Sequence, residues 1–278
     1  MAAKRKIQRL FLVLLMICIA GSLGACQKSD KTDSKEEKNL PKIKIGVDIL
    51  EPFFYVDENG GYTGIDAEIA KEACRRAGYE PEFVNIEWSD RDEYLENGDV
   101  DCLWSAFSKD GREDKYLWTE SYMEDDLRVI VDSRSPSKTL EEYRGPGGIA
   151  VRSGSKAEEI LLEDSNSADS KIQYVYSCGT FEMAKTAFVK RYADALACNE
   201  VVLQRIIDEN PEMYRYLDGK IMTAHFGVAF EKKEKNAYWE KINAAIEEMK
   251  QDGTITKITE KYGCNVSESE GGSSDGNK

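Results

Sequence analysis

The chain has 278 residues, of which 41% are apolar and 32% are charged, and its formal net charge is −14. This composition is typical of a globular protein of one or two domains. The acidic balance argues against nucleic-acid binding, which needs basic surface, and against attachment through anionic lipid head groups.

The first 25 residues differ from the rest. Lys4, Arg5, Lys6 and Arg9 form a basic head, and residues 10–20 are an apolar run too short to cross a bilayer comfortably. This order predicts a secretory signal peptide over residues 1–25. Its removal takes four of the 38 basic residues, which leaves 34 against 52 acidic residues and a net charge of −18.

The two ends of the remaining chain are polar. Residues 26–40 are rich in Lys, Asp, Glu, Ser and Asn, and they predict a flexible tether. Residues 266–278 have the composition of a disordered tail. The folded body therefore spans about residues 41–265, a size that usually divides into two lobes.

Strands and helices alternate in the first half of this body. The expected order is a strand at 43–48, a helix capped by Asp66 that ends near Ala77, a strand at 82–86, a short helix at 90–97 and a strand at 100–104. The order β-α-β-α-β favours a parallel sheet.

A second α/β unit follows. Strands are expected at 127–131, 148–151, 172–176, 193–198 and 224–230, and helices at 139–144, from Lys156 to about 162, at 180–190, from Glu200 to about 208, at 237–250 and at 254–262. We therefore predict an α/β protein with lobe 1 at 41–128, lobe 2 at 129–221, and a return to lobe 1 with the C-terminal helices at 222–265.

The segment from Val100 to Arg112 has features of a ligand-binding site. Ligands of open α/β sheets bind beyond the carboxyl ends of the strands, and Ser105 and Ser108 follow such a strand. The planar guanidinium of Arg112 could pair with a carboxylate through two hydrogen bonds. Taken alone, the segment also fits an ordinary loop with a surface arginine.

The cysteines and the single histidine limit the chemistry. Apart from Cys18 and Cys26, five cysteines remain, and Cys74 with Cys102 or Cys178 with Cys198 are possible pairs in an exported protein. No CxxC motif or histidine cluster is present, and His225 is the only histidine. The sequence therefore predicts no metal site, no cofactor and no His-dependent nucleophile.

The order of several motifs resembles the bacterial extracellular solute-binding proteins of family 3, which bind polar amino acids. The matching segments are Ile43–Asp48, Pro52–Phe53, Val56–Gly60, Gly64–Ala70, Gly98–Asp101, Val151–Ser155, Asp194–Ala195, Gly227–Ala229 and Asp252–Thr254, with Arg112 between them. The resemblance implies a type 2 periplasmic-binding-protein fold, with two lobes that close by a hinge motion around a small ligand. It also implies delivery of that ligand to an ATP-binding-cassette (ABC) permease.

The ending Leu23-Gly24-Ala25-Cys26 resembles a bacterial lipobox. This resemblance implies cleavage before Cys26 and lipid on its thiol, although small residues there also suit an ordinary signal peptide. Stable anchoring would need more than one acyl chain.

The resemblance also implies a set of ligand-binding residues. Arg112 aligns with the arginine that binds the α-carboxylate, and Ser105, Ala106 and Ser108 align with the nearby hydroxyl and amide contacts. Ser155 and Lys156 open a helix of the second lobe, where free N–H groups can hold an anion. Phe53 and Trp104 are candidates for an apolar wall, with core packing as the alternative.

The sequence departs from the family at the position that binds the ammonium group of the ligand. Asn199 stands where the family has an aspartate, and an amide oxygen accepts a hydrogen bond but carries no charge. Glu200 could substitute, or could be a helix residue favoured by the dipole. The loop from Ser108 to Arg112 and the segment from Gly46 to Phe53 are also shorter than the family pattern. These departures weaken the case for a standard α-amino acid.

We therefore expect a monomeric, lipid-anchored extracytoplasmic binding protein that captures an amino acid or a related small carboxylate for an ABC permease. One alternative is a dehydratase that acts on a prephenate-like acid. Glu51 and Glu200 are formally available for it, but no paired acid and base are visible. A second alternative is a ligand sensor or adhesin with the same fold.

Overall fold

The chain divides into two units, Met1–Asn39 and Leu40–Lys278. The computed structural model describes residues 40–167, 172–232 and 236–264, all in the second unit. The predicted signal peptide, Cys26, almost all of the tether and the C-terminal tail lie outside the described residues. None of the described helices is both long enough and apolar enough to cross a membrane.

The first sheet has five strands in the order β4-β1-β5-β13-β6. Their bounds are β1 Lys42–Val47, β4 Glu80–Asn85, β5 Cys102–Leu103, β6 Leu117–Trp118 and β13 Ala229–Phe230. β1 pairs in parallel with β4 and β5, whereas β13 pairs antiparallel with β5 and β6. The predicted parallel β-α-β-α-β unit therefore forms, and a late strand completes it.

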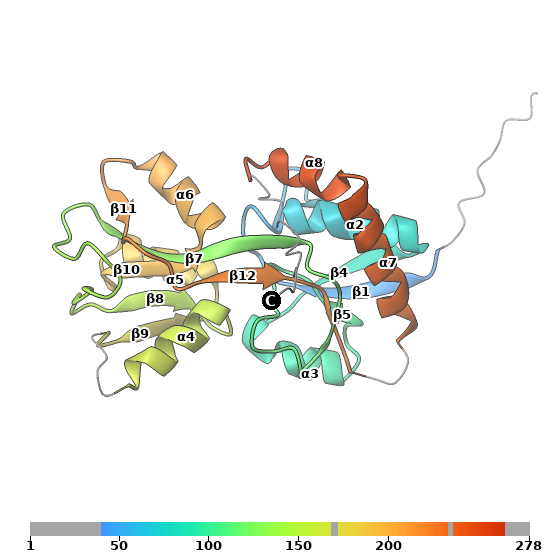
Figure 1. Ribbon diagram of the computed structural model, residues 1–278, viewed down its shortest axis with the longest axis horizontal. Coiled ribbons are helices and arrows are strands. Elements are labelled where there is room, and N and C mark those ends of the chain that lie inside the picture. Colours follow the sequence, from blue (N-terminus) through green and yellow to red (C-terminus); the bar gives the residue numbers. More distant parts are fainter. Residues whose placement is uncertain (1–39, 168–171, 233–235, 265–278) are drawn as a thin grey trace, which may run out of the picture. The chain divides into compact units, whose positions relative to one another are not determined.

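Helices cover both faces of this sheet. Their bounds are α2 Ile65–Ala77, η1 Trp88–Asp90, α3 Arg91–Glu96, α7 Ala237–Gln251 and α8 Thr254–Glu260. Figure 1 shows α2, α7 and α8 together on one side and α3 on the other. One apolar cluster around Ile43 and Ile69 fills the first side, and a second cluster around Trp88 and Leu95 fills the side of α3.

The second sheet has six strands in the order β11-β7-β10-β8-β9, and β12 also pairs with β7. Their bounds are β7 Met123–Asp132, β8 Ile149–Arg152, β9 Val175–Cys178, β10 Ala195–Asn199, β11 Tyr214–Tyr216 and β12 Met222–Phe226. Helices α4 Lys156–Ser165, α5 Phe181–Val189 and α6 Glu200–Glu209 cover it (Figure 1). A small hairpin, β2 Tyr55–Val56 with β3 Tyr62–Thr63, extends the first lobe.

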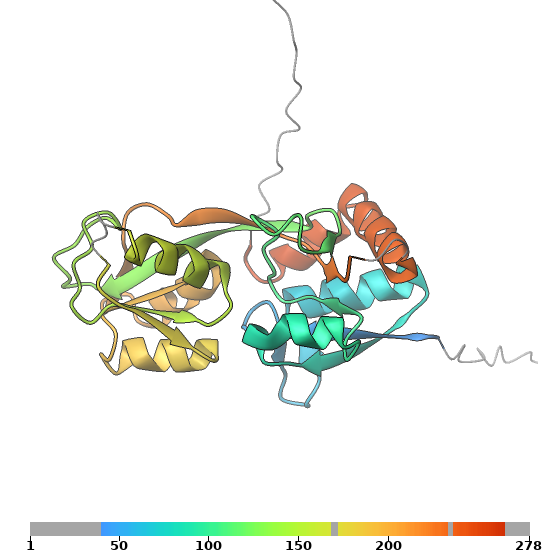
Figure 2. The same cartoon turned by 90° about the horizontal axis from the view of Figure 1, so that it is seen from below.

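Two antiparallel segments carry the chain between the sheets. β7 and β12 lie side by side in register from Met123 opposite Phe226 to Leu127 opposite Met222 (Figure 2). Beyond them, backbone hydrogen bonds join Tyr122 to Phe226 and Thr119 to Val228. These segments are the connection around which two α/β lobes can hinge.

Some local features differ from the sequence expectations. The N-cap of α2 is Gly64, so the expectation that Asp66 caps this helix is wrong. Residues 139–144 form turns instead of a helix, and β9 begins at Val175 instead of residue 172. The five described cysteines are free thiols, so neither suggested disulfide forms.

Gly64 starts α2 with a backbone that a side chain would not tolerate. Its φ is +117°, and an added Cβ would lie 2.4 Å from the carbonyl oxygen of Phe53. Both the dihedral angle and the close approach require glycine.

We therefore predict that Gly64→Ala lowers the free energy of unfolding by at least about 2 kcal/mol, because it adds a backbone clash to left-handed strain. Gly60→Ala is the matched control, since Gly60 has a φ of +82° with open space around its Cβ. It should cost only about 1 kcal/mol. Urea unfolding measures the free energy of unfolding of both variants. Equal losses of stability in the two would contradict the conclusion that the close approach to Phe53 requires glycine at position 64.

Candidate ligand-binding site

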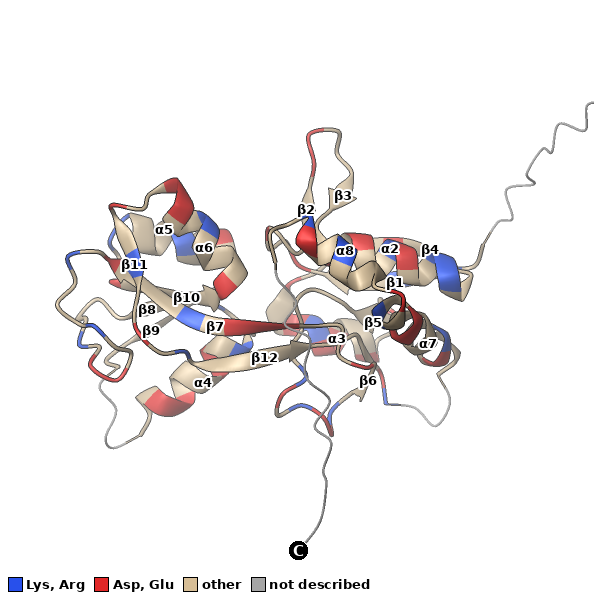
Figure 3. Ribbon diagram, turned by 45° about the horizontal axis from the view of Figure 1, so that its top comes forward, with Lys and Arg blue, Asp and Glu red and all other residues tan. Residues whose placement is uncertain are grey.

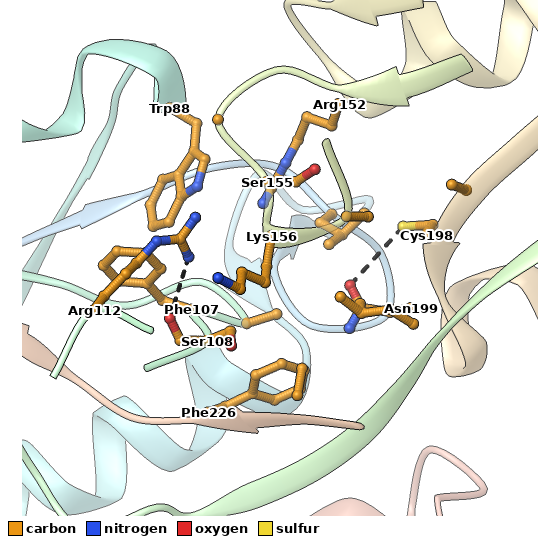
Figure 4. A pocket seen from close by; sticks show the side chains of 17 residues that line it. Trp88, Phe107, Ser108, Arg112, Arg152, Ser155, Lys156, Cys198, Asn199 and Phe226 are labelled. Carbon is orange, nitrogen blue, oxygen red and sulfur yellow. Dashed lines mark hydrogen bonds between the residues drawn. The ribbon is translucent and has the colours of Figure 1, made fainter. Parts of the chain in front are cut away.

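A pocket lies where loops of the two α/β units meet (Figure 4). It is lined by Leu50, Trp88, Ala106, Phe107, Ser108, Arg112, Leu127, Arg152, Gly154, Ser155, Lys156, Ala157, Ala197, Cys198, Asn199, Ala224 and Phe226. Its empty volume is about 450 Å³, part of it open to solvent.

The carboxyl ends of parallel strands supply most of the lining. Leu50, Trp88 and Ala106 follow β1, β4 and β5 of the first sheet, and Arg152 and Asn199 end β8 and β10 of the second. Ligands of open α/β sheets bind at such ends, because the loops there are free to present side chains and N–H groups. The pocket therefore has the position expected of a ligand site.

Arg112 lies in this pocket with 8% of its side chain exposed. It donates to the Ser108 carbonyl at 3.2 Å and to the Glu159 carboxylate at 2.8 Å. The other oxygen of Glu159 accepts from Lys156 Nζ at 2.6 Å. Desolvation opposes ionisation of Glu159, but the hydrogen bonds from Lys156 and Arg112 and their charges leave its pKa lowered. Arg112 thus holds a carboxylate of the chain itself.

Three guanidinium groups alternate with two aromatic rings beside the pocket. Arg152 and Arg91 lie over the Trp88 ring at 5.3 and 5.7 Å from its centroid. Arg91 and Arg112 lie over the Phe107 ring at 5.3 and 5.4 Å. Each ring face offers negative charge to a cation, so the rings separate like charges that would otherwise repel. We call Arg91, Arg112 and Arg152 the arginine cluster.

Arg152 also joins the two lobes through a buried ion pair. Its Nη1 donates to Asp48 at 2.7 Å, and both side chains are more than nine-tenths buried. Asp48 follows β1 of the first sheet, and its carbonyl oxygen accepts from the Ser105 hydroxyl at 2.8 Å. Loss of either partner would leave an uncompensated charge in this interior.

Asn199 closes the other side of the pocket. It is 7% exposed, and its Nδ2 has no hydrogen-bond partner in the described part of the chain. The Asp125 carboxyl lies nearby without lining the pocket. Burial raises the pKa of Asp125 to about 7, while the hydrogen bond from the backbone amide of Val201 acts in the opposite direction.

Asp66 positions the loop that carries Ala106. Its carboxylate accepts from the Ala106 amide at 2.5 Å and from the Tyr122 hydroxyl at 2.9 Å. Ala106 has a φ of +45°, which an alanine rarely adopts. The two hydrogen bonds therefore fix a strained turn at the pocket and tie it to α2 and to the segment that leads into β7.

The structure places six of the ten residues expected at the site in the pocket lining: Ala106, Ser108, Arg112, Ser155, Lys156 and Asn199. The other four lie elsewhere. Phe53 and Trp104 are buried in the core, and the hydroxyl of Ser105 bonds to the backbone at Asp48. Glu200 pairs with Arg128 at 2.6 Å. The assignment of the site residues to ligand binding remains a prediction.

Four further residues line the pocket that the sequence analysis did not predict as ligand-binding: Trp88, Phe107, Arg152 and Phe226. A signal for two of them existed, because Trp88 and Arg152 follow predicted strands at the edge where ligands bind. Phe226 gave no such signal, since it lies inside a predicted strand and reaches the pocket only through the pairing of β12 with β7.

Two α/β lobes, joined by two antiparallel segments and sharing a pocket at their strand ends, define a type 2 periplasmic-binding-protein fold. The chain belongs to the bacterial extracellular solute-binding proteins, family 3, whose sequence pattern matches residues 43–265. The predicted family and fold class are thereby confirmed.

Named relatives and solved structures are similar over most of their length. A probable histidine-binding protein of Campylobacter jejuni is 24% identical, with 91% of this chain and 98% of the relative covered. The arginine-binding extracellular protein ArtP of Bacillus subtilis is 24% identical, with 90% and 96% covered.

Among solved structures, an ancestral arginine-binding protein bound to arginine is 26% identical, with a TM-score of 0.70 over 80% of this chain and 97% of that one. The arginine-, lysine-, histidine-binding protein ArtJ from Geobacillus stearothermophilus is 21% identical, with a TM-score of 0.72 over 82% and 97%. At this identity, the similarity to ArtJ shows a shared fold alone.

The buried Asp66 carboxyl predicts a pH dependence of stability. Burial, the largest influence, raises its pKa to about 7 against the effect of its hydrogen bonds. An unfolded aspartate has a pKa near 3.9. The folded state therefore binds more protons between about pH 4 and 7, and its stability falls as the pH rises through this window.

Asp66→Asn should reduce this slope by up to about 1.4 kcal/mol per pH unit, because the amide keeps an acceptor and does not ionise. Urea unfolding at several values from pH 5 to 8 measures the slope. The exposed Asp114 provides the control substitution, Asp114→Asn. Identical slopes in the wild type and Asp66→Asn would show that Asp66 stays ionised throughout.

Proposed function

We propose that this protein is a lipid-anchored extracytoplasmic substrate-binding protein that captures an amino acid or a related small carboxylate. The observation that carries this proposal is that Arg112, a buried residue of the pocket lining, pairs with the carboxylate of Glu159, which does not itself line the pocket. Glu159 stands there for a ligand carboxylate, which needs the same charge-assisted donors. Lys156 and the N-terminus of α4 lie beside it and add donors for an anion.

The relatives support an amino acid or a similar acid as the ligand class. Their names include histidine-binding and arginine-binding proteins, and they cover about nine-tenths of this chain. In our proposal the ligand carboxylate displaces Glu159 from Arg112, and the lobes close on it about the β7 and β12 segments. The loaded protein, a monomer, then delivers the ligand to an ABC permease.

The dehydratase alternative has less support. One solved neighbour is an ancestral amino acid-binding protein described as a precursor of cyclohexadienyl dehydratase, at 24% identity. Such chemistry needs a general acid that reaches the ligand. No aspartate or glutamate lines the pocket in the described part of the chain. Glu200 and Glu51 instead pair with Arg128 and Arg205.

Arg112→Ala should abolish measurable binding of the ligand that a screen of amino acids and small carboxylates identifies. Removing one partner of a buried charge pair costs about 2–5 kcal/mol, or at least about 30-fold in Kd. Isothermal titration calorimetry of the mature protein measures Kd. Arg75→Ala is the control, because Arg75 pairs with Glu72 on the exposed face of α2. Unchanged affinity in a folded Arg112→Ala variant would remove Arg112 from the site.

The lipid anchor predicts a separate result. The wild-type protein should partition into the detergent phase of a two-phase extraction, and mass spectrometry should find acyl chains on an N-terminal Cys26. Cys26→Ser should move the protein to the aqueous phase, whereas Cys178→Ser should not, because Cys178 lies far along the chain on β9. A Cys26→Ser protein that stays in the detergent phase would contradict lipid anchoring.

A further inference from the structure

Positively charged side chains outnumber negatively charged ones around the pocket. Arg112, Arg152 and Lys156 line it, and Arg91 contacts the rings of two lining residues, Trp88 and Phe107. Two carboxylates pair with these four cations: Asp48 with Arg152, and Glu159 with both Arg112 and Lys156.

Arg91 makes no ion pair with a carboxylate of the described residues. Its guanidinium donates to the Trp88 carbonyl at 2.9 Å, and its Nε lacks a partner. Direct ion pairs thus give these four cations two carboxylates, and the charge of Asp92, which acts on Arg91 from outside the pocket lining, offsets the positive surplus only in part. A ligand with two negative charges would offset the remaining surplus.

The outer surface does not share this positive character. Acidic residues are distributed over α2, α4, α6 and α7 (Figure 3), in agreement with the net charge of −14. The positive surplus is therefore a property of the pocket and not of the whole molecule. Such a pocket concentrates small anions, because charge of one sign in a low-dielectric cleft focuses the field.

The described lining of the pocket has no negatively charged acceptor for an ammonium group. No carboxylate lines it in the described part of the chain, and the hydroxyl of Ser155 already accepts from the amide of Glu158. An ammonium among Arg112, Arg152 and Lys156 would meet like charges. The nearby Asp125 does not line the pocket, and burial keeps a large fraction of it neutral near pH 7. An α-amino acid would therefore bury its ammonium at a cost.

At the position where a charged acceptor would be needed, Asn199 has a neutral amide, whose oxygen can accept and whose Nδ2 can donate. Its side chain is 93% buried, and Nδ2 has no described hydrogen-bond partner. Figure 4 shows Asn199 on the side of the pocket opposite to Arg112, with Lys156 between them in this view. A buried donor without an acceptor is costly, and a ligand oxygen at this point would remove that cost.

We propose that the ligand is a small dicarboxylate without an ammonium group, held by Arg112 and Lys156 at one end and by Asn199 at the other. This inference deepens the proposed function and rests on it. The first carboxylate takes the place of Glu159 on Arg112 and Lys156. The second accepts a hydrogen bond from Asn199 Nδ2 and offsets the positive surplus of the arginine cluster.

The test compares matched ligands on the mature protein by isothermal titration calorimetry, after removal of any co-purified ligand by unfolding and refolding. Malonate, succinate, glutarate and adipate vary the spacing of two carboxylates. Each of succinate and glutarate is paired with its amino derivative, L-aspartate or L-glutamate, and L-arginine, L-histidine and L-glutamine represent amino acids with one α-carboxylate. We expect at least one dicarboxylate to bind at least about 10-fold more tightly than its amino derivative and than the other amino acids.

Two substitutions test the proposed roles of Asn199 and Glu159 separately. Asn199→Asp replaces the donor with a charged acceptor of the same shape, so it should weaken the dicarboxylate by at least 10-fold and strengthen its amino derivative. Glu159→Gln removes the competing carboxylate, so it should strengthen the dicarboxylate several-fold. Glu163→Gln, at an exposed position of the same helix α4, is the matched control and should change neither affinity.

The possible failures are distinguishable. An amino acid that binds as tightly as the best dicarboxylate, with sensitivity to Arg112→Ala, would overturn the inference and leave the proposed function intact. The absence of binding by every small carboxylate would overturn both. A dicarboxylate whose affinity is unchanged by Asn199→Asp in a folded variant would overturn the role of Asn199, and with it the two-ended arrangement.

Discussion

Positive charge in a space with little solvent is the constraint on which this site depends. The guanidinium groups of Arg91, Arg112 and Arg152 are largely buried, and each loses hydration energy there. The rings of Trp88 and Phe107 lie between them, and the carboxylates of Asp48 and Glu159 offset part of the charge. In the proposed function, an anionic ligand would offset the remaining charge.

The same contacts connect binding to the position of the lobes. Asp48 and Arg112 belong to the first lobe, and their partners Arg152 and Glu159 belong to the second. A ligand carboxylate that replaces Glu159 on Arg112 exchanges one contact across the cleft for another made through the ligand. The connection at β7 and β12 is held by backbone hydrogen bonds, so it does not depend on the side chains that would make this exchange. In our proposal, a few charged side chains thereby couple ligand binding to lobe closure.

Much of this arrangement was predictable from local pattern. The alternation of strands and helices indicated two parallel α/β units, and the resemblance to the family implied Arg112, Lys156 and Asn199 as site residues, all three of which line the pocket. The wall residues were not. Phe53 and Trp104 were expected there, but neither lines the pocket, whereas the equally buried Trp88, Phe107 and Phe226 do. Apolar periodicity shows that an aromatic side chain is buried, but it does not show whether it meets a cavity or another side chain.

The sequence by itself determined the elements, the family and the candidate charged groups, because each depends on residues close together in the chain. The tertiary structure alone decided how those charges pair. Asp66 was expected to cap its own helix, yet it binds the amide of Ala106 and the hydroxyl of Tyr122. Glu200 was a possible ligand for ammonium, yet it pairs with Arg128. Such pairings join residues 40 to 72 positions apart, and the Asp48–Arg152 pair joins residues 104 positions apart, so only the tertiary packing brings them within hydrogen-bond distance.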